Sequence, residues 1–340
     1  MRKALKLVGN AMKLPRRRFL HLTAAATAFP AVSRIALAQD YPTRPITVII
    51  AYPPGGSTDV VARIIGDSMR ASLGQSIIIE NIGGANGSIG VGRAVRAAPD
   101  GYTFTLGNWN NFVANGAVYV LPYDLLNDLK PVALISETPV LITTRKDLPA
   151  RDLKQLIAWM KQSPNKATEG HSGVGSIGHI VGVFFQQKTD TRFQLVPYRG
   201  GGPAVQDLIA GHIDIVMNAA SDTLSQARAG TINALAVTTS RRLTALPEVP
   251  TVDEAGLPGF YFQQWFGLWA PKGTPDDIIG KVSSAVANAL AEPAIRARLA
   301  DAGQEAYPPE QQSAQALGAL QRAEIAKWWP IIKGANIKAD

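Results

Sequence analysis

The chain has 340 residues, a formal charge of +8 and no cysteine, and 46% of its residues are hydrophobic. The first 38 residues hold eight basic side chains and no acid, which leaves 26 basic against 26 acidic residues in the rest. A basic nucleic-acid-binding surface is therefore excluded, and so is every site that needs a thiolate. The length and the low charged fraction are typical of one large or two medium α/β domains.

The first 38 residues have the features of an export signal. The apolar stretch 19–32 follows three arginines and precedes the A-x-A cleavage pattern at 36–38. The stretch is shorter than the about 20 apolar residues that span a membrane. The order R-R-R-F-L at 16–20 fits the twin-arginine pattern, and an ordinary Sec signal explains it equally well. Met12 is an alternative start, and we expect a mature periplasmic protein beginning near Gln39.

The next part of the chain predicts strand, helix, strand, helix and strand. The apolar run 46–51 is followed by a helix that starts at 57–59 and ends before Gly74. A second strand at 77–79, a helix reaching about 97 and a third strand at 102–106 come next. Because these strands are apolar without alternation, they predict a parallel sheet that is covered on both faces.

A similar α/β unit follows, so the mature chain contains two units in series. A proline-rich connection at 246–259 then leads to a strand at 264–270 and three helical stretches. The predicted elements of the second unit are helices at 153–160, 180–187 and 203–210 and strands at 193–196, 213–216 and 234–237.

Four glycine-rich loops each precede a predicted helix, at 53–59, 83–88, 173–176 and 199–203. Such a loop leaves backbone N–H groups pointing outward at the positive end of the helix dipole, which suits a carboxylate or a phosphate. Helix capping alone explains any single loop. Two pairs of loops, one pair in each unit, predict a small anion held between the units.

Motifs for other chemistry fail. Residues 173–178 match G-x-G-x-x-G, but no strong strand precedes them and no acid lies about 20 residues on. The G-x-S-x-G pattern fails at Ser88 and at Ser176, and no glycine run is followed by a P-loop lysine. A dinucleotide site and a hydrolase elbow are therefore disfavoured, and we expect a protein that is not an enzyme.

Histidine and tryptophan leave alternatives open. The mature chain has three histidines without metal-ligand spacing, so no metal or cofactor is expected. His171 lies in a glycine loop, where a ligand contact and a surface position are both open, whereas His179 and His212 are interpreted as structural. Trp109 follows the third strand and either walls a cleft or packs in the core.

Short ordered blocks along the whole mature chain resemble the Bug family, the extracytoplasmic solute-binding proteins of tripartite tricarboxylate transporters. The blocks are Y-P-T-R-P-I at 41–46, P-P-G-G-S-T-D at 53–59, E-N at 80–81, D-G-Y-T at 100–103, L-P-Y-D at 121–124, P-Y-R-G at 197–200, G-H-I-D at 211–214, L-P-E-V-P-T at 246–251 and A-P-K-G-T-P at 270–275.

The resemblance implies an α/β protein with a type II periplasmic-binding-protein fold, in which two Rossmann-like domains joined by a hinge close over one small carboxylate. It implies a first domain of 39–140 plus 264–340 and a second domain of 141–263. It further implies a monomer without cofactor that serves the membrane permease of such a transporter. A sensory subunit for a membrane histidine kinase would use the same site, and a hydrolase acting through Ser and His is a third, disfavoured hypothesis.

The resemblance also assigns the ligand site to the glycine loops of both units. To these loops we add Trp109, His171 and Asn218 from their own positions. The residues implied by the resemblance are Gly56, Ser57, Thr58, Asp59, Ala85, Asn86, Gly87 and Ser88 in the first domain, and Ser172, Ser176, Tyr198 and Arg199 in the second.

Several positions depart from the family pattern. Ile82 and Gly83 replace an Arg-Pro pair and Asn86 replaces a glycine, so the second loop loses a cation and rigidity. His171 stands where a small hydroxyl residue is common, and Asn218 stands where Asp is common. Because loss of an acid would remove a partner for a cationic group, the sequence predicts mono- or dicarboxylates, including aromatic ones beside Trp109, rather than amino acids.

Overall fold

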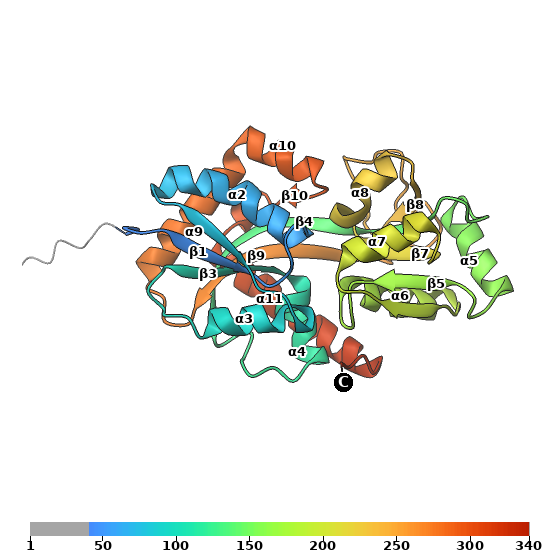
Figure 1. Ribbon diagram of the computed structural model, residues 1–340, viewed down its shortest axis with the longest axis horizontal. Helices are drawn as coiled ribbons and strands as arrows, with labels where there is room; N and C mark the ends of the chain where they lie inside the picture. Colours follow the sequence, from blue (N-terminus) through green and yellow to red (C-terminus); the bar gives the residue numbers. More distant parts are fainter. Residues whose placement is uncertain (1–40, 340) are drawn as a thin grey trace, which may run out of the picture. The chain divides into compact units, whose positions relative to one another are not determined.

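The computed structural model describes residues 41–339, drawn as coloured ribbon in Figure 1. The predicted export signal at 1–38 and the alternative start at Met12 lie outside the described residues. In the described part of the chain, no helix combines the length and the apolar character that crossing a membrane requires.

The first α/β unit folds as its hydrophobic pattern predicts. Its first strand lies between the other two and pairs with both in parallel. The first helix buries Val61, Ile65 and Met69, which recur at helical spacing, in the core beside this sheet. The elements are β1 (Ile46–Ile50), α2 (Ser57–Leu73), β2 (Ile77–Asn81), the 3-10 turn η1 (Ala85–Gly87), α3 (Ser88–Val95) and β3 (Thr103–Asn108).

The sequence does not predict the longest strand, β4 (Leu129–Arg145). This strand pairs with β9 (Gln263–Pro271) up to Pro139, and with β7 (Ile215–Ala219) and β8 (Ile232–Val237) from Val140 onward. Two register shifts interrupt its pairing with β9, and its prolines obscure the strand pattern. We call residues 41–139 and 263–339 half 1, which includes β1, β2, β3, β9, the first part of β4 and β10 (Glu305–Ala306). We call residues 140–262 half 2, which includes the last part of β4 and β5 to β8.

Half 2 contains two elements that the sequence does not predict, β5 and α8. The strand β5 reads Thr-Glu-Gly-His and lacks an apolar run, so a short strand does precede the loop at 173–176, where the sequence predicts no strong one. The second predicted strand of this unit begins at Ile215 rather than at 213. The elements are α5 (Leu153–Gln162), β5 (Thr168–His171), α6 (Ile177–Thr189), β6 (Gln194–Pro197), α7 (Gly201–Ala210), β7 (Ile215–Ala219), α8 (Ala220–Arg228) and β8 (Ile232–Val237).

The sheet is mixed rather than parallel throughout. Its strand order is β2-β1-β3-β9-β4-β7-β5-β6, and β8 and β10 each pair with β4 beside this path. Strand β9 runs antiparallel to both β3 and β4, while β5 is parallel to β6 and β7. The predicted parallel pairing therefore holds among β1, β2 and β3 and among β5, β6 and β7, whereas every pair made by β4 or β9 is antiparallel.

The three predicted C-terminal helices are present and return to half 1, where α9 packs on α2 and α11 lies beside β4 (Figure 1). Trp328 of α11 also contacts half 2, with ring centroids 6.0 Å from Phe184 and 5.4 Å from Phe262. The remaining elements are the π-helical turn η2 (Asn110–Ala114), α4 (Asn115–Val118), α9 (Asp276–Ala291), α10 (Pro293–Asp301), β10 (Glu305–Ala306), the 3-10 turn η3 (Pro309–Gln311) and α11 (Ala314–Gly334).

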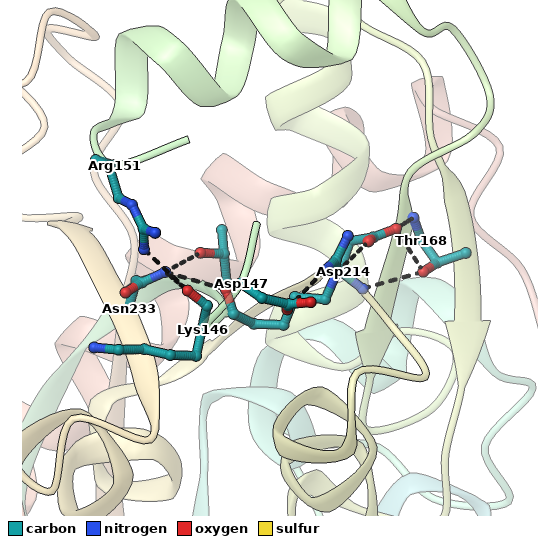
Figure 2. A network of polar contacts seen from close by, with 8 residues as sticks. Lys146, Asp147, Arg151, Thr168, Asp214 and Asn233 are labelled. Atoms are coloured by element: carbon teal, nitrogen blue, oxygen red, sulfur yellow. Dashed lines mark hydrogen bonds and ion pairs between the residues drawn. The ribbon is translucent and has the colours of Figure 1, made fainter. Parts of the chain in front are cut away.

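A polar network ties together strand ends of half 2 that lie opposite its glycine loops (Figure 2). Arg145 at the end of β4 donates to Asp214 at 2.8 Å, and Asp214 accepts from both the backbone and the hydroxyl of Thr168 before β7 begins. Asn233 of β8 donates to the carbonyl of Arg145 at 3.1 Å. These bonds connect the ends of β4, β5, β7 and β8, and the glycine loops follow the other ends of β5 and β6.

Candidate functional site

The loop after β1 ends at a helix start without a side-chain cap. Helix α2 begins at Ser57 after Gly56, whose backbone is extended. The N–H groups in the first turn of a helix lack intrahelical partners, so this turn presents backbone donors and a positive dipole end. Ser57 is half-buried, and its hydroxyl lies beside these donors in the chain.

Asp59 stabilises this loop from inside. Its side chain is buried and accepts hydrogen bonds from the backbone of Gly55 at 2.9 Å, Arg63 at 2.8 Å and Asn81 at 3.0 Å. Burial alone would raise the pKa of Asp59, but these hydrogen bonds outweigh it and lower the pKa. Because its carboxylate already accepts from three internal donors, Asp59 stabilises the loop. The expectation that Asp59 contacts a ligand directly fits this arrangement poorly.

The loop after β2 is held in a left-handed conformation. Ala85, Asn86 and Gly87 all have positive φ values, of 46°, 48° and 88°. Asparagine tolerates this region better than most residues, and glycine occupies it freely. A Cβ at Gly87 would lie 2.1 Å from Asn111 Nδ2, so glycine is required here for space as well. Helix α3 then starts at Ser88, again without a side-chain cap.

Three asparagines join the two loops of half 1, and none of them is among the residues expected in the site from the sequence. Asn108 donates to Thr58 Oγ1 at 3.1 Å, while Asn111 and Asn115 donate to the carbonyl of Asn86 at 3.1 and 2.9 Å. Asn108, Asn111 and Asn115 are buried. Asn108 ends strand β3, Asn111 lies in the helical turn that follows, and Asn115 begins the next helix. The run of asparagines directly after a buried strand is the signal that would have revealed them.

Trp109 packs in the core. Only 1% of its surface is exposed, and its indole N–H donates to Glu324 Oε2 at 2.9 Å. Trp328 approaches its ring edge-on at 5.5 Å and donates to the same carboxylate oxygen. Of the two roles expected for Trp109, the structure supports packing in the core, so this buried side chain gives no reason to favour aromatic ligands.

His171 and Ser176 lie beneath the first loop of half 2. Ser176 is fully buried and caps α6 by accepting a hydrogen bond from the backbone of His179. His171 is also buried and stacks on the ring of His179 with centroids 4.6 Å apart. Burial, and then the neighbouring His179, lower the pKa of His171 to about 4, so this imidazole is neutral at pH 7. Both side chains are buried and hold the loop through hydrogen bonds, His171 to the backbone of Gly173 and Ser176 to the backbone of His179.

Tyr198 and Arg199 occupy the second loop of half 2. The backbone N–H of Tyr198 donates to the carbonyl of His171 at 2.8 Å, which joins this loop to the first. The phenol of Tyr198 donates to Asp207 at 2.7 Å and is therefore occupied. Arg199 is exposed and makes no ion pair with any acid between 41 and 339.

The acid that seemed to be lost at Asn218 is present one helical turn further on. Asn218 is buried, and its amide donates to Ser172 Oγ at 3.0 Å and to Asp222 Oδ2 at 2.8 Å. Burial raises the pKa of Asp222 to about 6. The premise that this part of the molecule lacks a carboxylate is therefore wrong, because Asp222 supplies one.

The loops of the two halves meet beside α4. The phenol of Tyr119 donates to the carbonyl of Val174 at 3.0 Å. Val118 also lies so close to Gly175 that a Cβ there would come within 2.9 Å of it. The structure thus brings the predicted loops into two polar networks, one in each half, with a direct contact between them.

A separate cavity of about 420 Å³ lies where β4 passes from one half to the other, away from these loops. Glu137 and Glu305 line it from half 1, and Arg241 and Arg242 line it from half 2. Between residues 41 and 339, no group of three or more potential metal ligands is gathered in one place.

Comparison with known proteins shows the family. Residues 61–337 match the family described as the tripartite tricarboxylate transporter family receptor, and the chain belongs to it. It is 36% identical over 305 residues to protein BugT of Bordetella pertussis, an alignment that covers 88% of this chain and 93% of BugT.

Two solved structures have the same fold. MatC from Rhodopseudomonas palustris with bound malate is 36% identical, with a TM-score of 0.81 over 86% of this chain and all of MatC. Rpa4515 of R. palustris with adipate is 33% identical, with a TM-score of 0.83 over 88% of this chain and all of Rpa4515. The predicted periplasmic-binding-protein fold and the Bug resemblance are confirmed, and the protein is a solute-binding receptor of this type.

Proposed function

We propose that this protein captures a small carboxylate between its two halves and presents the closed form to the membrane permease of a tripartite tricarboxylate transporter. The observation that carries the proposal is the pair of helix starts at Ser57 and Ser88, neither with a side-chain cap, whose loops are joined by asparagines. Such N–H groups suit a carboxylate. Malate and adipate in the related structures are both carboxylates, which supports this ligand class.

A hinge at the crossing strands fits this proposal. Strand β4 changes partners between Pro139 and Val140, and β9 begins at Gln263. We propose that 39–140 plus 264–340 move as one domain and 141–263 as the other, because only the connections at these points join them along the chain. We also propose that the predicted export signal delivers the protein to the periplasm, where a permease partner is accessible.

Ligand class is tested by a thermal-shift screen of mono-, di- and tricarboxylates, aromatic acids, amino acids and sugars. A ligand at about 100 times its Kd adds about 2.7 kcal/mol to the stability of the folded state. Stabilisation by carboxylates supports the proposal. Protein that is free of co-purified ligand by mass spectrometry and that no carboxylate stabilises would refute it.

The backbone donors are tested by a proline at the first helical position. Ser57→Pro removes one N–H, while proline suits the first turn and Gly56 before it is already extended. We expect roughly tenfold or greater weakening of carboxylate binding, because hydrogen bonds to charged groups contribute about 1.5–3 kcal/mol.

Two variants control for other effects of this proline. Ser57→Ala removes the hydroxyl and keeps the N–H, so it separates the two donors. Ala314→Pro places a proline at the first position of α11, outside the site, and is expected to leave binding unchanged. Equal affinity of Ser57→Pro and the unaltered protein would rule out this backbone donor.

A further inference from the structure

A carboxylate of half 2 lies against the start of α7. Asp222 is in the first turn of α8 and is half-buried. Its Oδ2 atom accepts a hydrogen bond from Asn218 and lies 2.7 Å from the point where a Cβ on Gly201 would stand. Gly201 is the first residue of α7, so the contact between this acid and the helix start requires a glycine.

The start of α7 is the position in half 2 that would attract a second ligand carboxylate. Its N-cap, Gly200, has no side chain to satisfy the first N–H groups, and the positive end of the helix dipole lies here. Asp222 brings the protein's own negative charge to this position. A ligand carboxylate arriving here would meet a like charge, whereas a hydrogen-bond donor would meet an acceptor.

The neighbours of Asp222 strengthen this preference. Both amide hydrogens of Asn218 are used, one by Ser172 Oγ and one by Asp222 Oδ2, so Asn218 offers no donor to a ligand. The second oxygen of Asp222 makes no hydrogen bond to the described part of the chain and remains an acceptor. Arg199 is the nearby cation in this loop, but it is exposed and forms no ion pair with Asp222.

We infer that Asp222 is a specificity-determining residue. It favours an acid whose far end carries a hydrogen-bond donor, either a hydroxyl or an ammonium group, over an acid whose far end carries a second carboxylate. The inference rests on the proposed function, because it assumes that the first carboxylate binds at α2 and α3. It assigns to this chain a ligand class different from that of malate and adipate, which both carry two carboxylates.

The test compares acids that share a carbon chain and differ at one end. Isothermal titration calorimetry with the purified protein measures butyrate, γ-hydroxybutyrate, γ-aminobutyrate and succinate, and the corresponding sets with shorter and longer chains. We expect the best hydroxy or amino acid to bind at least about tenfold more tightly than the dicarboxylate of the same chain length. Comparison of the hydroxy acids with the amino acids shows whether Asp222 prefers a neutral hydrogen-bond donor or a cation.

Two substitutions link the preference to this residue. Asp222→Ser and Asp222→Asn should each reduce the ratio of the two affinities by about tenfold, with the dicarboxylate gaining. Asp190→Asn is the matched control, because it removes an exposed acid at the end of α6 in the same half, where φ is 51° and asparagine is tolerated. The ratio should not change in this control. Since each ratio is measured within one protein, partial loss of folded protein does not affect it.

Two results would overturn the inference while leaving the proposed function intact. One is a dicarboxylate that binds as tightly as its hydroxy and amino counterparts, and the other is an affinity ratio that neither Asp222 variant changes. If no carboxylate of any length binds, the proposed function itself fails and this inference fails with it.

Discussion

The phenol of Tyr119 donates a hydrogen bond to the carbonyl of Val174 and so joins half 1 to the first glycine loop of half 2. Tyr119 follows α4, and α4 begins at Asn115, which holds the loop around Asn86. One short segment therefore contacts a glycine loop of each half. Under the proposed hinge, this segment contacts both the site of the first domain and the loop of the second domain that moves on closure.

We predict that Tyr119→Phe weakens carboxylate binding by roughly fivefold, because a net hydrogen bond contributes about 1 kcal/mol and this one forms between the two halves. Titration calorimetry measures the change. Tyr261→Phe is the control, because its hydroxyl bonds Asp253 within half 2. If Tyr119→Phe and the control bind equally well, the contact does not contribute to closure.

Gly87→Ala should be far more damaging than Gly55→Ala. Both glycines have positive φ, of 88° and 84°, so alanine costs about 1–2 kcal/mol of backbone strain at either position. A Cβ at Gly87 also collides with Asn111, whereas a Cβ at Gly55 meets nothing within 4 Å. We expect the difference in unfolding free energy, measured by urea denaturation, to exceed roughly 1 kcal/mol. Equal losses would mean that the loop adjusts to the collision.

The pKa of His171 predicts acid sensitivity. Because its pKa is about 4 in the folded protein and 6.5 for an unperturbed histidine, the unfolded chain binds the proton first as pH falls. The resulting stability is fully present above pH 6.5 and declines between about 6.5 and 4, by roughly 3 kcal/mol. His171→Gln should flatten this decline, whereas His212→Gln at an exposed position should not. Parallel curves for the two variants would contradict the prediction.

Glu169 should make the stability of the folded protein depend on pH in the opposite direction. It is fully buried in β5, and neither carboxyl oxygen has a partner of good hydrogen-bond geometry between 41 and 339. Burial raises its pKa well above 4.5 and outweighs the lowering effect of the nearby Met217 backbone. The unfolded chain therefore releases this proton first, and stability declines as pH rises above 4.5. Glu169→Gln should be more stable than the unaltered protein at pH 7 and show a smaller difference at pH 4. A thermal-unfolding difference that is the same at both pH values would contradict this.

The local fold was predictable where the hydrophobic pattern is strong. Helix α2 and strand β1 have regular apolar spacing and were placed within one residue. Strand β5 was missed because its buried members are Glu169, Gly170 and His171, which carry no apolar pattern. Strand β4 was missed because prolines and register shifts break its alternation, although it is the element that joins both halves.

The positions of the glycine loops in the candidate site were predictable from the sequence. The contacts that their side chains make were not. Glycine runs before helices indicate where backbone donors are exposed, so the loops at Ser57 and Ser88 were located correctly. The direction of each side chain depends on its neighbours, which come from distant segments. Asp59 is hydrogen-bonded to Asn81, and Trp109 is hydrogen-bonded to Glu324. These internal contacts differ from the ligand contacts that the positions of both residues in the sequence suggested.

The sequence by itself determined the family, the two α/β units and the positions of the glycine loops, because these depend on local spacing and on residue types that turns and helix starts require. The tertiary structure decided which side chains of these loops are buried and hydrogen-bonded, because burial and hydrogen bonding are settled by contacts between segments far apart in the chain. Asp222 illustrates the difference. Its role follows from packing against Gly201 and Asn218, and no spacing within its own helix records that contact.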